Sequence, residues 1–200
     1  MWWLFWCVLG LDFAPSRYMC YRWGMTLTCI ECLTEFEHEG SRGRIPKFCG
    51  VTCRVRAHRN KGGIPSAMRE RDRWVRAVGK RPVMPDGSPA SCTDPYTWAR
   101  WHDVSAGAGD GWGFMLGDGV GCYDLDDCLV DGALKDSAVP LVDHIIKNNR
   151  IIYSEVSMSG SGLHLFAVMD EQPGRVLDGY EVYSRARFIR MTGNHYEVKA

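Results

Sequence analysis

Two aspartates one residue apart are the side chains in this sequence best suited to chemistry. Asp124 and Asp126 follow the apolar run Val120–Tyr123. Residues two apart in a strand point to the same side, so the run presents both carboxylates together. Like charges side by side are unfavourable unless a cation compensates them. The pair therefore predicts a site for Mg²⁺ or Mn²⁺. An isolated Asp-x-Asp also occurs in many surface turns, and Asp127 fits such a solvated turn equally well, so it is left out of the site.

A Ser/Gly-rich turn follows this pair after about 35 residues. It reads Ser159-Gly-Ser-Gly-Leu-His164. Glycines let backbone N–H groups approach a ligand closely, and Ser159 and Ser161 add hydroxyl donors. With His164 at the start of an apolar strand, the segment could cradle a triphosphate. Taken alone, the turn fits an ordinary hairpin better, but its position after the aspartates favours a nucleotide site.

A third acid lies in the short apolar run Tyr180–Tyr183. Glu181 is a lone acid there, and a buried acid is costly without a partner. A third metal carboxylate explains it. Arg187 is placed either to contact phosphate or only to pair with Glu181.

Four cysteines form two close pairs, with sixteen residues between the pairs: Cys29, Cys32, Cys49 and Cys53. Four thiolates at this spacing can surround one Zn²⁺ tetrahedrally. A module of about thirty residues has little core, so the metal would supply most of its folding energy. Free or paired thiols and a redox Cys-x-x-Cys are the other interpretations. His38 and His58 fit less well as substitute ligands.

The segment after the last cysteine is basic. Arg54, Arg56 and Arg59 follow Cys53 at a spacing that suits a helix. Because arginine binds phosphate bidentately, this helix could lie along a nucleic-acid backbone. The alternative is a structural zinc site with a solvated helix.

The distribution of charge also separates a basic part of the chain from an acidic one. The net charge is zero, but Arg54–Arg81 holds ten Lys/Arg and two acids, whereas Asp118–Asp143 holds seven Asp and one Lys. One part suits phosphate and the other suits metal, although two solvated helix faces would look the same. The hydrophobic share of 46% indicates a globular protein. Nine cysteines without a convincing export signal argue against a disulfide scaffold.

The chain divides into four stretches. Residues 1–24 are apolar and unassigned; we favour a start at Met25, with a truncated signal, a membrane anchor or a packed segment as alternatives. Residues 25–60 form the zinc module, 61–79 a linker and helix, and 80–200 the catalytic domain. The helix is expected from Ser66 to about Val78, with Ser66 as its cap.

The sequence of the expected catalytic domain predicts a mixture of strands and helices. The expected fold class is therefore α+β, with helices on one face of a sheet. A short helix over Tyr96–His102 is expected after Asp94 as cap and Pro95 as first residue. The other expected elements are a hairpin of Gly111–Leu116 and Gly119–Leu125, a helix over Ser137–Asn148, strands over Ile151–Val156 and Leu163–Val168, and a last hairpin of Tyr180–Tyr183 and Arg187–Thr192.

Taken in order, the three acidic and Ser/Gly segments resemble the bifunctional primase-polymerase domains of phages and mobile elements, within the archaeo-eukaryotic primase superfamily. The matching stretches are Asp124-Leu-Asp126, Ser159-Gly-Ser-Gly-Leu-His164, and Glu181 before Arg187-Phe and Thr192-Gly193. Lys80-Arg-Pro82 and Asp94-Pro-Tyr-Thr-Trp98 also match segments usual upstream in that family. The resemblance covers about Lys80 to Gly193.

The resemblance implies an RRM-like catalytic sheet that makes or extends primers on a DNA template from nucleoside triphosphates. It implies two Mg²⁺ or Mn²⁺ ions on Asp124, Asp126 and Glu181, and a triphosphate held by the remaining site residues: Ser159, Ser161, His164 and Arg187. A cysteine module stands where that family's N-terminal part usually lies, and no helicase follows the third segment. We therefore expect a separate replicative helicase as partner, no membrane association, and a place in the bacterial cytoplasm. The alternatives are a zinc-containing DNA-binding accessory protein without catalysis and a metal-dependent nuclease.

Overall fold

The computed structural model describes residues 24–39 and 44–198. Apart from Gly24, the apolar segment considered above lies outside these residues. Among the residues described, there is no helix with both the length and the apolar character needed to cross a membrane.

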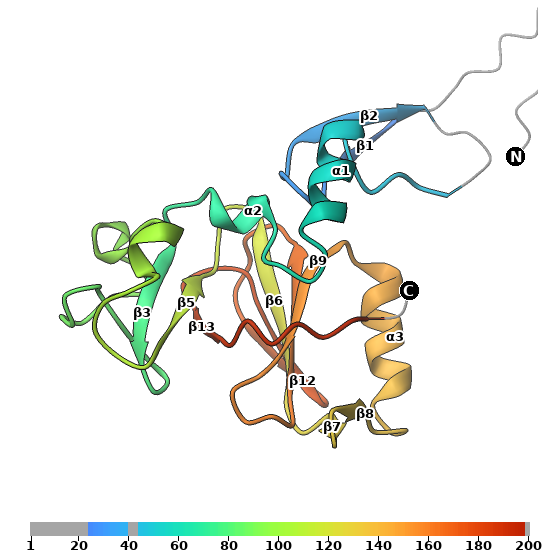
Figure 1. Cartoon of the computed structure of the whole chain (residues 1–200). Helices are drawn as coiled ribbons and strands as arrows, with labels where there is room; N and C mark the ends of the chain where they lie inside the picture. Colours follow the sequence, from blue (N-terminus) through green and yellow to red (C-terminus); the bar gives the residue numbers. More distant parts are fainter. Residues whose placement is uncertain (1–23, 40–43, 199–200) are drawn as a thin grey trace, which may run out of the picture.

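The body of the molecule, which follows the cysteine module, consists of two antiparallel sheets and one main helix, which lie in three layers (Figure 1). The larger sheet has the strand order β11-β12-β6-β10-β9, with β6 Val120–Leu125, β9 Ile151–Val156, β10 Leu163–Val168, β11 Arg175–Leu177 and β12 Tyr180–Tyr183. The smaller sheet has the order β13-β5-β3-β4, with β3 Trp74–Val78, β4 Arg81–Val83, β5 Gly111–Met115 and β13 Phe188–Met191. The short pair β7 Leu129–Val130 and β8 Ala133–Leu134 precedes the helix α3 Val139–Asn148.

The larger sheet buries both of its faces because its central strands carry apolar residues on both sides. On one face, Leu163 and Leu165 of β10 pack with Val142 and Ile145 of α3. On the opposite face, Phe166 of β10 belongs to a second core that includes residues from the smaller sheet. A helix, α3, therefore covers one face, as expected, but a second sheet covers the other. The fold class α+β is confirmed, and the expectation of a single sheet is wrong.

The core between the sheets is rich in aromatic side chains. Trp74 and Phe114 are fully buried and lie 5.0 Å apart, centroid to centroid. Trp101 packs on Trp74 at 4.5 Å, and the indole N–H of Trp74 donates to the carbonyl of Met68. Burial of side chains this large is a major stabilising contribution in a domain of this size.

The chain crosses between the two sheets where the sequence predicted hairpins. A tight turn does form at Gly117–Gly119, with hydrogen bonds between Gly117 and Val120, but β5 and β6 then enter different sheets. The same holds for β12 and β13, which the segment 184–187 connects. Both predicted hairpins are wrong in their pairing, although their strands are present. By contrast, β9 and β10 form the antiparallel neighbours that their sequences suggest.

The basic stretch after the linker is a strand rather than a long helix. Helix α2 covers only Ser66–Arg69, and β3 begins at Trp74. Ser66 does not cap the helix with its side chain; its hydroxyl donates to the carbonyl of Glu31 at 2.6 Å. Pairing of β3 with both β4 and β5 outweighs the local helical pattern.

The start signal at Asp94 is confirmed, but the helix it begins is short. The Asp94 carboxylate accepts from the Tyr96 N–H at 3.1 Å, and Pro95 opens a 3₁₀ turn that ends at Thr97. A second 3₁₀ turn covers Trp101–Val104. Between them, Ala99 exchanges two backbone hydrogen bonds with Trp74, which interrupts the predicted helix.

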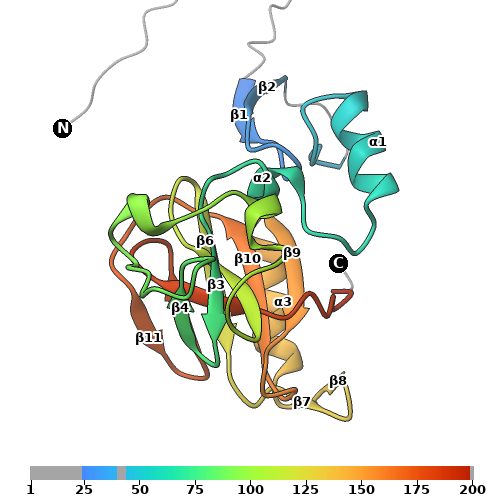
Figure 2. The same ribbon diagram turned by 60° about the vertical axis from the view of Figure 1, so that its left-hand side comes forward.

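The cysteine module lies at one end of the molecule, where β1, β2 and α1 group together above α2 (Figures 1 and 2). Its elements are β1 Gly24–Thr28, β2 Glu35–Glu39 and α1 Val51–Arg59. The module docks on the body through the carbonyl of Glu31, which accepts from the Ala67 N–H at 2.7 Å as well as from Ser66. The Arg150 guanidinium donates to the carbonyls of Pro46 and Lys47 from the other side.

Candidate functional site

The central feature of the larger sheet is a row of polar side chains that crosses four adjacent strands. Glu181 of β12 stands opposite Asp124 of β6, Asp124 stands opposite His164 of β10, and His164 stands opposite Glu155 of β9. Residues directly opposite each other in a sheet share a face and are close neighbours. Three of the four were singled out from the sequence. The sheet therefore gathers side chains that lie far apart along the chain.

The Asp124 carboxylate is held in a partly buried position, with 21% of its side chain exposed. Burial raises its pKa, because the charged form loses hydration, and the charges of Asp126 and Glu181 raise it further. His164 opposes this rise, with its Nε2 3.6 Å from an Asp124 oxygen. A carboxylate of this kind would gain from a compensating cation, so the Mg²⁺ or Mn²⁺ site stays a prediction.

Glu155 is a candidate site residue that the sequence did not reveal. Its side chain is fully buried, yet three groups donate to it: the Nδ1–H of His164 at 3.0 Å, and the backbone N–H groups of Thr192 and Gly193. These bonds fix the ring of His164 and the Thr192–Gly193 turn against each other. The signal was present in the sequence, since Glu155 is a lone acid in an apolar strand, as Glu181 is.

Glu181 has protein partners of its own. The Tyr183 hydroxyl donates to its Oε2 at 2.7 Å, and Arg187 lies 3.6 Å from the same oxygen. This hydrogen bond is the main cause of the raised pKa of Tyr183. Arg187 also stacks over the Tyr183 ring at 4.3 Å. The sequence had left open whether Arg187 pairs with Glu181, and in this structure it does.

The three acids do not close around a common point. In the described part of the chain, only the four cysteines bring three or more potential ligand atoms within 4.8 Å of one another. Asp124 and Asp126 still fit a hard divalent ion, since they stand two residues apart at the end of β6. Glu181 would fit as a third ligand only if a contact with the ion replaced its contacts with Tyr183 and Arg187.

A cavity of about 360 Å³ opens at this row, between the two sheets; we call it the cleft. Asp124, Asp126 and His164 line one wall. The rest of the lining comes from the smaller sheet and the residues beside its strands, and it includes three cations: Lys80, Arg187 and Arg190. Arg187 pairs with Glu181 at 3.6 Å, and Arg190 pairs with Asp110 at 3.3 Å. A cleft that contains both carboxylates and cations suits a metal-bound polyphosphate. Lys80 and Pro82, which the sequence had matched only as an upstream segment, belong to this lining.

The Ser/Gly turn forms the rim of the cleft. Ser159 lines it, and its hydroxyl lies 3.0 Å from that of Ser157 and 3.1 Å from that of Ser161. Gly162 is required for packing, because a Cβ there would lie 2.6 Å from the carbonyl oxygen of Leu125. Ser161 is not part of the lining, so Ser159 and His164 are the members of the turn that face the cleft.

Asp127, which the sequence analysis set aside, is indeed separate from the cleft. Its backbone has a positive φ of 47°, which is typical of a turn, and its carboxylate pairs with Lys135 at 2.8 Å. Asp127 is therefore a surface turn residue.

The four cysteines form a compact group in the module, as their spacing predicted: Cys29, Cys32, Cys49 and Cys53. The three separations measured between the sulfurs of the last three are 3.8, 3.6 and 3.6 Å. Four sulfurs about 2.3 Å from one Zn²⁺ would lie about 3.8 Å from each other. The group could therefore hold a metal such as zinc. All four cysteines are free thiols.

Local backbone structure creates this group from both ends of the module. Leu33 adopts a positive φ of 59°, and its N–H donates to the carbonyl of Cys29, which closes the first knuckle. Cys53 lies in the first turn of α1 and is buried. Burial opposes ionisation of Cys32, but hydrogen bonds with Thr34 and with neighbouring thiols outweigh it and lower its pKa to about 7. A thiol that ionises readily is a good metal ligand.

The helix that follows the last cysteine is present, as expected, but its arginines differ in their surroundings. Arg56 donates to the hydroxyl of Ser66 and pairs with Glu70 at 3.4 Å, so it joins the module to α2. Arg54 and Arg59 are exposed.

Comparisons with known proteins add no further constraint. No protein-family model matches the chain, and no curated protein matches it.

Proposed function

We propose that this protein is a DNA primase-polymerase, which joins nucleotides from nucleoside triphosphates on a DNA template by a two-metal mechanism. One observation carries the proposal: Asp124 and His164, the two central members of the row Glu181–Asp124–His164–Glu155, line a cleft that also contains Asp126 and three cations. This arrangement can hold a metal-bound triphosphate between carboxylates and cations. It adds to the resemblance with primase-polymerase domains and fits an RRM-like catalytic sheet.

Asp124, Asp126 and Glu181 hold the Mg²⁺ or Mn²⁺ ions in this proposal. Two such ions favour ionisation of the attacking 3′-hydroxyl and neutralise charge on the pyrophosphate leaving group. A bound cation compensates the partly buried negative charge of Asp124, which burial otherwise disfavours. Glu181 exchanges its contact with Arg187, and Arg187 then becomes available to the phosphates.

The triphosphate is held by the other residues of the cleft. His164 presents Nε2 to the cleft because Glu155 engages its Nδ1. Ser159 offers a hydroxyl from the rim, with Ser161 behind it. Lys80 adds a cation from the turn between β3 and β4, and Arg190, which pairs with Asp110, adds another from β13. Charged donors that are in place before the reaction stabilise developing charge without a reorganisation cost.

The zinc module and the remaining partners complete the proposal. We assign the module to binding of the DNA template, with Zn²⁺ as a structural ion. A separate helicase supplies the single-stranded template, and the reaction takes place in the cytoplasm of a bacterial host.

The test is incorporation of labelled nucleotides by the purified protein with a single-stranded template and Mn²⁺. We expect new product from the wild-type protein and none from Asp124→Asn, while template binding is retained. Asp127→Asn is the matched control, because Asp127 pairs with Lys135 outside the cleft and asparagine tolerates its positive φ. Full synthesis by Asp124→Asn would rule out the proposed role of the row.

A DNA-binding accessory protein without catalysis is the second candidate. The observation in its favour is that Glu181 is already satisfied by Tyr183 and Arg187, so the three acids do not converge. The same assay separates the two, because an accessory protein binds template without incorporation. A shortened template would instead indicate the metal-dependent nuclease.

A further inference from the structure

A second and larger cavity, of about 710 Å³, lies between the cysteine module and the catalytic body. We call it the inter-module cavity. Lys47 and Phe48 line it from the module, Lys61 from the linker, Lys147 from the end of α3, and Arg150 from the start of β9. Segments that are distant in sequence therefore meet around one space.

The lining of this cavity is strongly basic. Among the described residues that line it, Glu31 is the one acid, against five Lys or Arg. Glu31 is buried and its carboxylate accepts from the Ser66 N–H at 3.4 Å, so it is directed to the module–body contact. Lys61 and Lys147 pair with Glu197 and Asp143 only through exposed contacts, which contribute little. A surface with this balance attracts a polyanion.

Arg150 holds the module's wall of the cavity in place. Its terminal nitrogen donates to the carbonyls of Pro46 and Lys47. Its guanidinium also adds positive charge to the lining of the cavity.

The walls also offer flat and apolar surface. Phe48 is half-buried, and the exposed ring of His195 stacks on the buried ring of Tyr153 at 5.8 Å, centroid to centroid. Phe48 and His195 line the cavity together with apolar residues of β9. Sites for single-stranded nucleic acid combine cations along the backbone with such surfaces for the bases.

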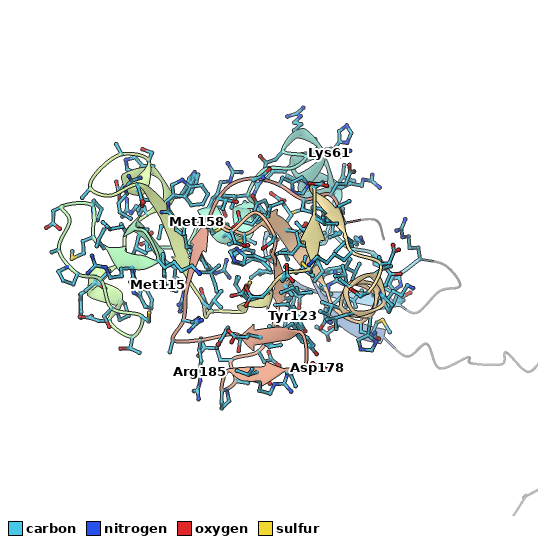
Figure 3. All side chains as sticks on the ribbon, turned by 90° about the horizontal axis from the view of Figure 1, so that it is seen from below. Lys61, Met115, Tyr123, Met158, Asp178 and Arg185 are labelled. Atoms are coloured by element: carbon cyan, nitrogen blue, oxygen red, sulfur yellow. The ribbon has the colours of Figure 1, made fainter. Side chains whose placement is uncertain are left out.

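The position of the cavity relates it to the cleft. Ile151 lines the cavity, and Glu155, on the same strand, lies beside His164 at the cleft. Four residues of a strand span about 13 Å. Figure 3 shows Lys61 on the side of the molecule opposite Asp178, in the turn of the β11–β12 hairpin, and Arg185, just after β12. The cavity is thus at the β9 edge of the sheet, one strand away from the His164 position.

We infer that the inter-module cavity binds single-stranded DNA, with its phosphates on Lys47, Lys61, Lys147 and Arg150, and leads the template toward the cleft. The strand lies between module and body rather than along α1. The role as template path rests on the proposed function, whereas the binding itself does not.

The experiment compares two double charge reversals by fluorescence anisotropy with a labelled oligothymidylate. Lys47→Glu with Lys147→Glu changes opposite walls of the cavity, and both side chains are exposed. Arg54→Glu with Arg59→Glu changes the net charge equally at two exposed residues of α1 that do not line the cavity. We expect the cavity pair to weaken binding about tenfold or more and to reduce the salt slope by about 1.4, the contribution of two phosphate contacts. The helix pair should change binding less than about twofold by the same reasoning.

Equal losses in the two double variants, or a loss only in the helix pair, would overturn the inference, because the strand would then contact α1 outside the cavity. Nucleotide incorporation separates this outcome from failure of the proposed function. If Asp124→Asn synthesises as well as the wild type while the cavity pair still loses binding, the proposed function fails and the cavity remains the DNA site. If the wild type synthesises and the cavity pair binds normally, the inference alone fails.

Discussion

The Nδ1–H of His164 donates to Oε1 of Glu155 across 3.0 Å, and the Glu155 side chain is completely buried. The same carboxylate accepts from the backbone N–H groups of Thr192 and Gly193. One buried carboxyl group therefore orients the histidine of the cleft and anchors the turn after β13. Loss of any one of these hydrogen-bond donors should therefore destabilise the folded protein.

The first prediction concerns Glu155→Gln. An amide has one acceptor oxygen, so it cannot accept from His164 and from both backbone N–H groups as the carboxylate does. We expect unfolding free energy to fall by about 1–3 kcal/mol and incorporation per folded molecule to fall about 100-fold, with a raised KM for nucleotide. Chemical denaturation and steady-state kinetics measure the two effects.

The matched control for Glu155 is Glu171→Gln. Glu171 is an exposed acid that also accepts a backbone N–H, from Asp118, but it lies outside the cleft. It should leave incorporation unchanged. If Glu155→Gln lowers stability but leaves the kinetics of the folded protein unchanged, Glu155 has a structural role only.

The second prediction concerns the buried charge of Asp124. Burial raises its pKa, so the folded protein favours the protonated carboxyl. The contribution of Asp124 to stability is therefore largest at low pH. It is lost as the pH rises from the pKa of the unfolded chain, about 3.9, through the raised pKa of the folded protein. Without Mg²⁺ or Mn²⁺ at neutral pH, we expect Asp124→Asn to be more stable than the wild type by about 1 kcal/mol.

Urea denaturation over a pH series measures this difference, which should shrink as the pH is lowered. Addition of Mg²⁺ should stabilise the wild type and not Asp124→Asn. Asp143→Asn, on the exposed side of α3 beside Lys147, is the control and should change stability by less than about 0.5 kcal/mol. A wild type that is more stable than Asp124→Asn without divalent metal would contradict the assigned cost of this charge.

The third prediction concerns the cysteine module. Cys49→Ser removes one of four sulfurs that lie within 4.8 Å of one another, so bound zinc should fall from one ion per chain to a small fraction. Hydrogen exchange should then lose protection over β1, β2 and α1 and keep it in the two sheets, because metal supplies the folding energy of so small a module. Cys92→Ser is the control, since Cys92 lies outside the group. Full zinc content in Cys49→Ser would exclude the four-thiolate site.

The fourth prediction concerns the contact between module and body. Arg150→Ala removes the donations to Pro46 and Lys47, which should cost about 1–3 kcal/mol at this contact. Trypsin should then cut faster after Lys47, while the melting temperature of the body stays close to that of the wild type. Arg175→Ala, on the exposed edge strand β11, should leave the cutting rate unchanged. Unchanged cutting in Arg150→Ala would show that other contacts hold this wall.

The features that the sequence determined by itself are local ones. The Cys-x-x-Cys spacing fixes which thiols can meet, because a knuckle needs only a tight turn such as the one at Leu33. Asp94 and Pro95 specify a helical start through their own hydrogen bond and dihedral angle. The strands β9 and β10 and the helix α3 follow from the periodicity of their apolar residues.

Tertiary structure decided which strands pair and which side chains meet. Apolar runs report burial but not the partner strand, so β5 and β6 enter different sheets despite the turn between them. For the same reason, Trp74–Val78 is a strand, since β4 and β5 flank it. The buried partner of His164 and the cationic part of the cleft lining at Lys80 come from other elements of the fold, and no local pattern encodes such long-range contacts.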